Sequence, residues 1–149
     1  MRDVFNVKRS ADSDDVLKAV NGQWVPSITF DADGDLEDRD SGKVVLIGAN
    51  GVDVTLPTAA EGLNFTFILK ADYDTAVCTI VQASASEDFY GVVIDGTTGT
   101  SGDAAAASNT KIQFGTASLK GDRVELWSDG VGWYAKAICK ADNGITFEN

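Results

Sequence analysis

Carboxylates and aromatic rings are the side chains in this sequence that could carry a chemical function. The 149 residues include no histidine, which excludes histidine-based triads, imidazole general bases and histidine metal sites. Two carboxylates can cleave a glycosidic bond, but the acidic residues are spread over predicted turns and no pair stands out. No glycine-rich phosphate loop lies between a strand and a helix. We therefore expect no enzymatic activity and no cofactor.

One acidic segment, DADGDLED, has a spacing that suggests a cation. Asp31, Asp33 and Asp35 alternate as the oxygen ligands of an EF-hand loop do. The sixth position of that loop is Leu36 instead of glycine, and the twelfth is Gly42 instead of a bidentate glutamate. We interpret the segment as a solvated acidic loop. A calcium site at the three aspartates remains the alternative.

The most aromatic segment, GDRVELWSDGVGWYAKAI, contains an Asp-Gly pair between two strand-like runs, which predicts a hairpin. Side chains alternate between the two faces of a strand. Trp127 therefore faces away from Leu126 on the first strand, and Trp133 faces away from Tyr134 on the second. At least one of these three aromatic rings must lie on the face opposite the core.

Three interpretations of that outward ring stay open. Trp127, Trp133 and Tyr134 could form a platform on which a glycan stacks. Alternatively, a large amphipathic ring could pack against a neighbouring subunit. In a monomer, the same ring would only support the hairpin by cross-strand pairing.

The elements that must position these residues are strands. Short runs of apolar and β-branched residues alternate with turn signals about every ten residues, which is typical of an all-β protein. The sequence predicts an antiparallel β-sandwich or barrel of about ten short strands with an extended N-terminal arm. Asn50-Gly51 predicts a tight turn after which the chain returns as the next strand. The expected strands are 23–30, 42–49, 52–56, 62–69, 76–83, 89–94, 111–116, 122–128, 131–138 and 144–147.

The net charge of the chain makes some classes of partner unfavourable. The formal net charge is −11, and 18 of the 23 acidic residues are aspartates, which prefer turns and caps to helix interiors. Such a chain repels phosphate backbones, so we expect no direct nucleic-acid partner. No stretch is apolar enough to span a membrane, and the N-terminus lacks the apolar core of a signal peptide.

The chain divides into an arm, residues 1–22, and a β body, residues 23–149. The arm is polar and includes one helix-compatible run, SDDVLKAV. It is too short of apolar residues to fold alone, so we expect it to bind a neighbouring subunit. Its candidate contact residues are basic or apolar: Arg2, Val4, Phe5, Lys8, Arg9, Val16 and Leu17.

The two cysteines, Cys78 and Cys139, both lie within apolar runs. We expect two buried thiols that act as small hydrophobic side chains. Their spacing does not resemble a zinc site.

Two motifs together resemble a known class of protein. The segment VTLPTAAEGLNFTFIL is similar to V-x-L-P…G-x-x-F-x-F segments that recur in β-rich structural proteins of tailed bacteriophages. LWSDGVGWYAKAI is similar to the L-x-S-D-G-x-x-W-Y closing hairpin of the same proteins, which include capsid decoration (cement) proteins and tail-fibre modules. The resemblance covers about residues 43–138 and leaves out the arm and the acidic loop.

This resemblance implies a virion component, usually a homotrimer with a β-sandwich or barrel body. A short chain with an extended arm favours a decoration protein on the outer capsid surface over a segment of a long fibre. Its partners would then be the major capsid protein and further copies of itself. The alternative is a receptor- or glycan-binding module of a tail fibre, which would use the aromatic platform.

Overall fold

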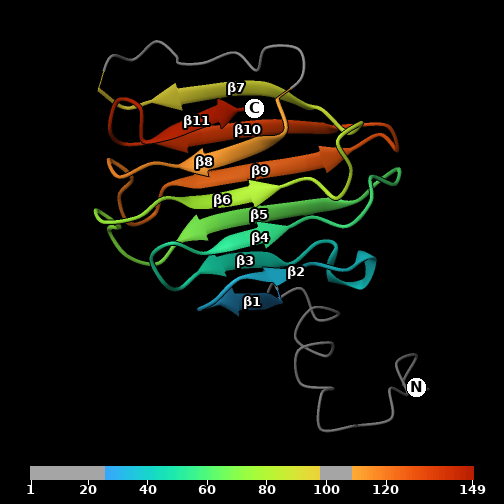
Figure 1. Cartoon of the computed structure of the whole chain (residues 1–149), viewed down its shortest axis with the longest axis horizontal. Coiled ribbons are helices and arrows are strands. Elements are labelled where there is room, and N and C mark those ends of the chain that lie inside the picture. Colours follow the sequence, from blue (N-terminus) through green and yellow to red (C-terminus); the bar gives the residue numbers. More distant parts are fainter. Residues whose placement is uncertain (1–25, 98–108) are drawn as a thin grey trace, which may run out of the picture.

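The computed structural model describes residues 26–97 and 109–149 (Figure 1). The predicted arm, residues 1–22, lies outside this part of the chain. The described residues form eleven strands, and their only helix is a single 3-10 turn, Asp38–Asp40. None of their helices is long and apolar enough to cross a membrane. The prediction of an all-β protein is therefore confirmed for the described residues.

The strands form two mixed sheets. Sheet A contains, in spatial order, β1 (Ser27–Phe30), β3 (Val44–Ile47), β5 (Asn64–Leu69), β9 (Arg123–Ser128), β10 (Trp133–Cys139) and β7 (Phe89–Asp95). Sheet B contains β11 (Ile145–Glu148), β8 (Lys111–Phe114), β6 (Cys78–Val81), β4 (Asp53–Thr55) and β2 (Gly34–Asp35).

The first six strands alternate between the sheets. β1, β3 and β5 run parallel in sheet A, and β2, β4 and β6 run parallel in sheet B. The chain therefore winds around the core, and Figure 1 shows these strands following one another along the body in sequence order. The second half adds antiparallel pairs, β5–β9, β9–β10, β6–β8 and β8–β11, while β7 returns parallel to β10.

The winding corrects two expectations. The sheets are mixed and neither is closed, so a purely antiparallel sandwich or barrel is not what the chain forms. Asn50-Gly51 does make a turn, with Gly51 at φ +76°, but it joins β3 of sheet A to β4 of sheet B instead of closing a hairpin. The Asn50 side chain accepts a hydrogen bond from the Ala76 backbone N–H at 3.1 Å, which ties this turn to the next coil of the winding.

Both sheets contribute their inward side chains to one core. Its largest fully buried members include Trp133, Phe65, Phe67, Phe89 and Phe114. The rings of Phe65 and Trp133 lie 6.0 Å apart between centroids. Cys78 and Cys139 are also buried and form no disulfide, which confirms the expectation for the cysteines.

Candidate functional site

The candidate site is the outer face of sheet A, defined as the side chains of its six strands that point away from the core. Large hydrophobic residues that are exposed in the described chain concentrate there. They are Tyr90, Val92, Ile94, Trp127 and Tyr134, and the one further exposed member is Val131 in the β9–β10 turn. Strand alternation places them, because each of these residues has buried neighbours on both sides or borders glycine or a turn.

Three aromatic residues form one cross-strand row, which we call the aromatic row. Trp127 pairs with Tyr134 between β9 and β10, and Tyr134 pairs with Tyr90 between β10 and β7. The two tyrosine rings lie 5.7 Å apart between centroids. The three residues remain 43–48% exposed, so the row presents a continuous aromatic surface to solvent.

The turn beside this row is held by one carboxylate. Asp129 accepts hydrogen bonds from the backbone N–H of Val131 at 2.9 Å and of Gly132 at 3.0 Å. Its second oxygen accepts the Tyr134 hydroxyl at 3.0 Å. The hydrogen bonds from Gly132, Val131 and Tyr134 lower the pKa of Asp129. The same bond to Asp129 raises the pKa of Tyr134, so it favours the protonated hydroxyl.

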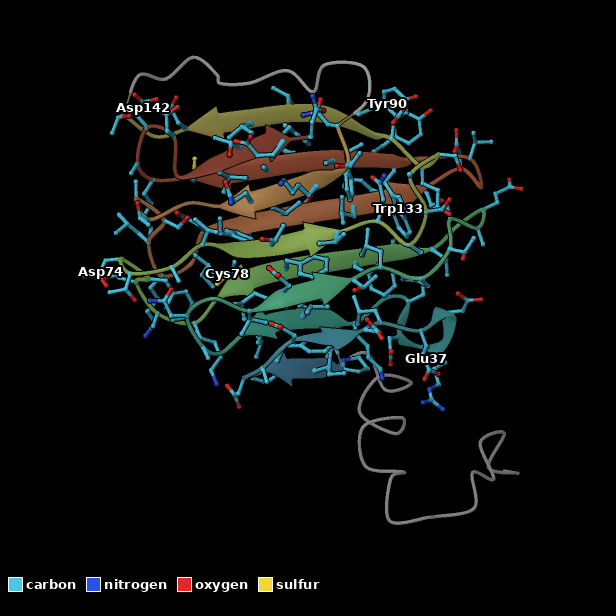
Figure 2. The ribbon with its side chains drawn as sticks, viewed as in Figure 1. Glu37, Asp74, Cys78, Tyr90, Trp133 and Asp142 are labelled. Atoms are coloured by element: carbon cyan, nitrogen blue, oxygen red, sulfur yellow. The ribbon has the colours of Figure 1, made fainter. Side chains whose placement is uncertain are left out.

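The structure removes Trp133 from the predicted aromatic platform. Its side chain is fully buried, packs against Phe65 and donates its indole N–H to Glu87 at 3.5 Å. Of the three predicted residues, the structure therefore brings only Trp127 and Tyr134 together on the surface. Figure 2 labels Trp133 and Tyr90 at the same end of the sheets.

Tyr90 is the member of the row that sequence reasoning missed. It lies more than forty positions from Tyr134 and reaches it because β7 returns parallel to β10. A signal was present in FYGVVI, where apolar residues occupy both alternating faces. Val93 and Phe89 are buried, whereas Tyr90, Val92 and Ile94 are exposed. The strand therefore carries apolar side chains on its outward face as well as on the face that packs in the core.

Next to the aromatic row lies a row with both signs of charge. Lys136 on β10 pairs with Glu125 on β9, and Val92 flanks Lys136 on β7. The third row is mostly aliphatic: Ile94, Ile138, Arg123, Ile68 and Leu46 follow one another across the sheet. The face therefore combines aromatic, charged and aliphatic rows in register.

In the part of the chain that the structure describes, no group of three or more potential metal ligands comes together, and this part includes Asp31, Asp33 and Asp35. Asp33 accepts the Asp53 backbone N–H at 2.8 Å, and Asp35 belongs to strand β2. Asp40 accepts hydrogen bonds from Lys43 and from the Glu37 backbone. Burial raises the pKa of Asp40, but those bonds outweigh it and lower the pKa overall. The carboxylates of Asp33 and Asp40 therefore form hydrogen bonds that stabilise the conformation of the loop.

The predicted arm contacts cannot be placed. They lie outside the described residues: Arg2, Val4, Phe5, Lys8, Arg9, Val16 and Leu17. Comparison of the chain with protein-family models, curated proteins and solved structures finds no match. A function for this chain therefore has to be argued from its own residues and surfaces.

Proposed function

We propose that the chain is a non-enzymatic structural protein of a phage virion, which decorates the outer surface of the capsid and stabilises the assembled shell. In this proposal the arm binds the major capsid protein, and the body contacts a neighbouring subunit. A protein that binds the assembled shell and not free subunits stabilises the shell by mass action.

The observation that carries the proposal is the outer face of sheet A. Tyr90, Trp127 and Tyr134 are exposed side by side; such rings can support the sheet by cross-strand pairing, but contiguous exposed apolar surface also marks an interaction site. Two members of the row, Trp127 and Tyr134, lie on the hairpin LWSDGVGWY, which is the segment that resembles the closing hairpin of phage structural proteins. The resemblance and the exposed surface thus point to the same residues.

The test is binding of the full chain to expanded capsid shells of the source phage, measured by co-sedimentation. We expect the arm variant R2E/K8E/R9E to lose most of its shell occupancy, because three basic side chains are reversed. The control, Lys111→Glu, changes charge on strand β8 of sheet B and should bind as the parent chain does. Unchanged occupancy of the arm variant would contradict the role of the arm.

A second candidate, a glycan-binding module of a tail fibre, is supported by the aromatic row itself. Three adjacent exposed rings offer an apolar surface on which a pyranose can stack. Asn64 at one end of the row and Asp129 in the turn beside Tyr134 can accept hydroxyl hydrogen bonds. This candidate predicts saccharide binding that Trp127→Ala abolishes. Val131→Ala, an exposed control outside the row, should retain it. A glycan array without hits counts against this candidate.

A further inference from the structure

The outer face of sheet A differs in charge from the rest of the chain. Three charged side chains of its strands point outward, Arg123, Glu125 and Lys136, of which two are basic and one is acidic. Asp95 of β7 is buried. The whole chain carries −11. Two copies of such an acidic protein repel one another, and the outward side chains of this face, with more basic than acidic groups, do not add to that repulsion. The charge of this face therefore permits a contact between copies.

We propose that the outer face of sheet A binds the same face of a second copy, around a two-fold axis that runs parallel to the strands between β9 and β10. Two-fold contacts are isologous. About this axis, a residue of β9 or β10 meets, in the second copy, the residue with which it is paired across the strands of one copy. The proposal goes beyond shell decoration and does not depend on it. Shell binding and self-association are measured separately, so either can fail alone.

The register of the sheet makes this face complementary to itself. With the axis between β9 and β10, Glu125 lies over Lys136 of the second copy, because these two residues are paired within one copy. Opposite charges then meet twice across the contact.

The apolar rows match in the same arrangement. Trp127 lies over Tyr134 of the second copy, since these residues are also registered neighbours. Ile94 on β7 lies over Ile68 of the second copy on β5, because β7 and β5 flank the β9–β10 pair on either side. The same axis places Tyr90 over Asn64 of the second copy. It also places Ile138 over Arg123, whose aliphatic stem can cover it.

The area of the contact is sufficient for specific association. Four strands spaced about 4.8 Å apart and about 20 Å long give a projected contact of about 400 Å² per copy. Side-chain relief raises the accessible area, so the two copies together bury about 1,000 Å², the lower limit of a specific interface. We therefore expect an association that depends on protein concentration, with a Kd in the micromolar range or weaker.

Other occupants fit the face less well. A saccharide covers the aromatic row but leaves the aliphatic row of Ile94, Ile138 and Ile68 exposed. The trimer implied by the phage resemblance uses a heterologous contact, which does not place Glu125 over Lys136 of another copy. The mass of the complex distinguishes a pair from a trimer.

The deciding experiment uses charge reversal in the full chain and reads solution mass by light scattering over a concentration series. We expect the parent chain to rise from 15.7 kDa toward twice that mass. Glu125→Lys alone and Lys136→Glu alone should each weaken association at least about tenfold, because like charges then meet twice across the contact. An equimolar mixture of the two variants should restore association, since opposite charges meet again between unlike chains.

The matched control is the registered pair Glu148 and Lys111 on sheet B. Like Glu125 and Lys136, these two residues are cross-strand neighbours of opposite charge. Glu148→Lys and Lys111→Glu therefore make the same charge changes on sheet B, and should leave the association unchanged. Melting temperatures measured on every variant separate a loss of association from a loss of folding. Rescue in the mixture cannot arise from an effect within one chain.

A second measurement covers the case in which a charge variant fails to fold. Chains carrying Ile94→Cys and chains carrying Ile68→Cys, mixed under oxidising conditions, should form a disulfide-linked heterodimer. Neither variant should cross-link efficiently with itself, because the axis pairs position 94 with position 68. A parent chain that stays monomeric, forms a trimer or associates equally well after Glu125→Lys would overturn the proposal, as would a mixture that shows neither rescue nor cross-linking.

Discussion

The outer faces of sheets A and B follow the same strand alternation but carry different side chains. Sheet A presents the aromatic row and the aliphatic row. Sheet B presents mostly threonine and charged residues: Asp35, Asp53, Thr55, Thr79, Val81, Lys111, Gln113, Thr146 and Glu148. Both sheets bury their other face in the same core. Core formation therefore requires one apolar face of each sheet and does not require an apolar outer face on either.

This difference shows that the apolar outer face is not a requirement of the fold. A sheet with one solvated face normally alternates apolar inward and polar outward residues, as sheet B does. Exposed apolar side chains beyond that pattern favour association or aggregation. If the outer face of sheet A makes the proposed contact with a second copy, substitutions there should affect binding more than stability.

The two tryptophans of the β9–β10 hairpin test this separation most strongly. Trp133→Ala should lower the free energy of unfolding by about 3–5 kcal/mol, because it empties a fully buried site. Trp127→Ala should lower it by less than about 1 kcal/mol, because Trp127 is 48% exposed and contributes mainly cross-strand pairing. Urea denaturation of both variants measures the difference.

The same pair of variants should reverse order in association. Trp127→Ala should weaken self-association of the folded chain, whereas Trp133→Ala, at temperatures where it is folded, should affect association less. Equal losses of stability in the two variants would mean that Trp127 stabilises the folded chain as much as Trp133 does. The outer face of sheet A would then not be specialised for association.

A smaller effect is expected at Gly91, where strand β7 approaches β10. Gly91 has φ +156°, and a Cβ atom there would lie 1.9 Å from the Ala135 carbonyl oxygen. Gly91→Ala should therefore shift β7 and lower the free energy of unfolding by about 2 kcal/mol. It should also weaken association, because β7 carries Tyr90, Val92 and Ile94.

The control for this prediction is Gly96→Ala, just beyond the end of β7. A Cβ atom at Gly96 would meet its nearest atom at 3.3 Å, so a small relaxation accommodates it. Thermal unfolding and light scattering of both variants measure the two effects. A Gly91→Ala chain as stable as the Gly96→Ala chain would show that β7 is free to move away from β10.

Much of the fold was predictable because its signals are local. All ten expected strands are present, and alternation correctly placed Leu126 and Trp127 on opposite faces of β9. The eleventh strand, Gly34–Asp35, has only two residues and no apolar pattern. The sheet topology was not predictable in this way. Parallel winding is set by contacts between residues about twenty positions apart, and a turn such as Asn50-Gly51 looks the same whether it stays in one sheet or crosses to the other.

The candidate site was predicted only in part for the same reason. Alternation showed that Trp133 and Tyr134 face opposite ways, but not which of them is buried. That choice depends on packing between distant residues, since Trp133 is fully buried and contacts Phe65 and Glu87. Tyr90 joined the row through the parallel β7–β10 pairing, a contact that leaves no mark in the local sequence of either strand.

The smallest predicted effect concerns the protonation of the aromatic row. The hydrogen bond to Asp129 raises the pKa of Tyr134, so its contribution to stability is present below the ordinary tyrosine pKa and is lost as the pH rises through the raised value. The pKa of Asp129 is lowered, so its contribution is present above the ordinary aspartate pKa and is lost as the pH falls through the lowered value.

Asp129→Asn should return the pKa of Tyr134 toward the ordinary value of about 10, because the acceptor loses its charge. Ultraviolet titration of tyrosinate in the parent chain and this variant measures the change, and Tyr134→Phe identifies the group. Val131→Ala is the control, since its backbone N–H still reaches Asp129. If Asp129→Asn leaves the titration unchanged, the turn does not fix the ring. The aromatic row would then be a mobile surface, and the registered stacking of Trp127 on Tyr134 of a second copy would lose its preorganised geometry.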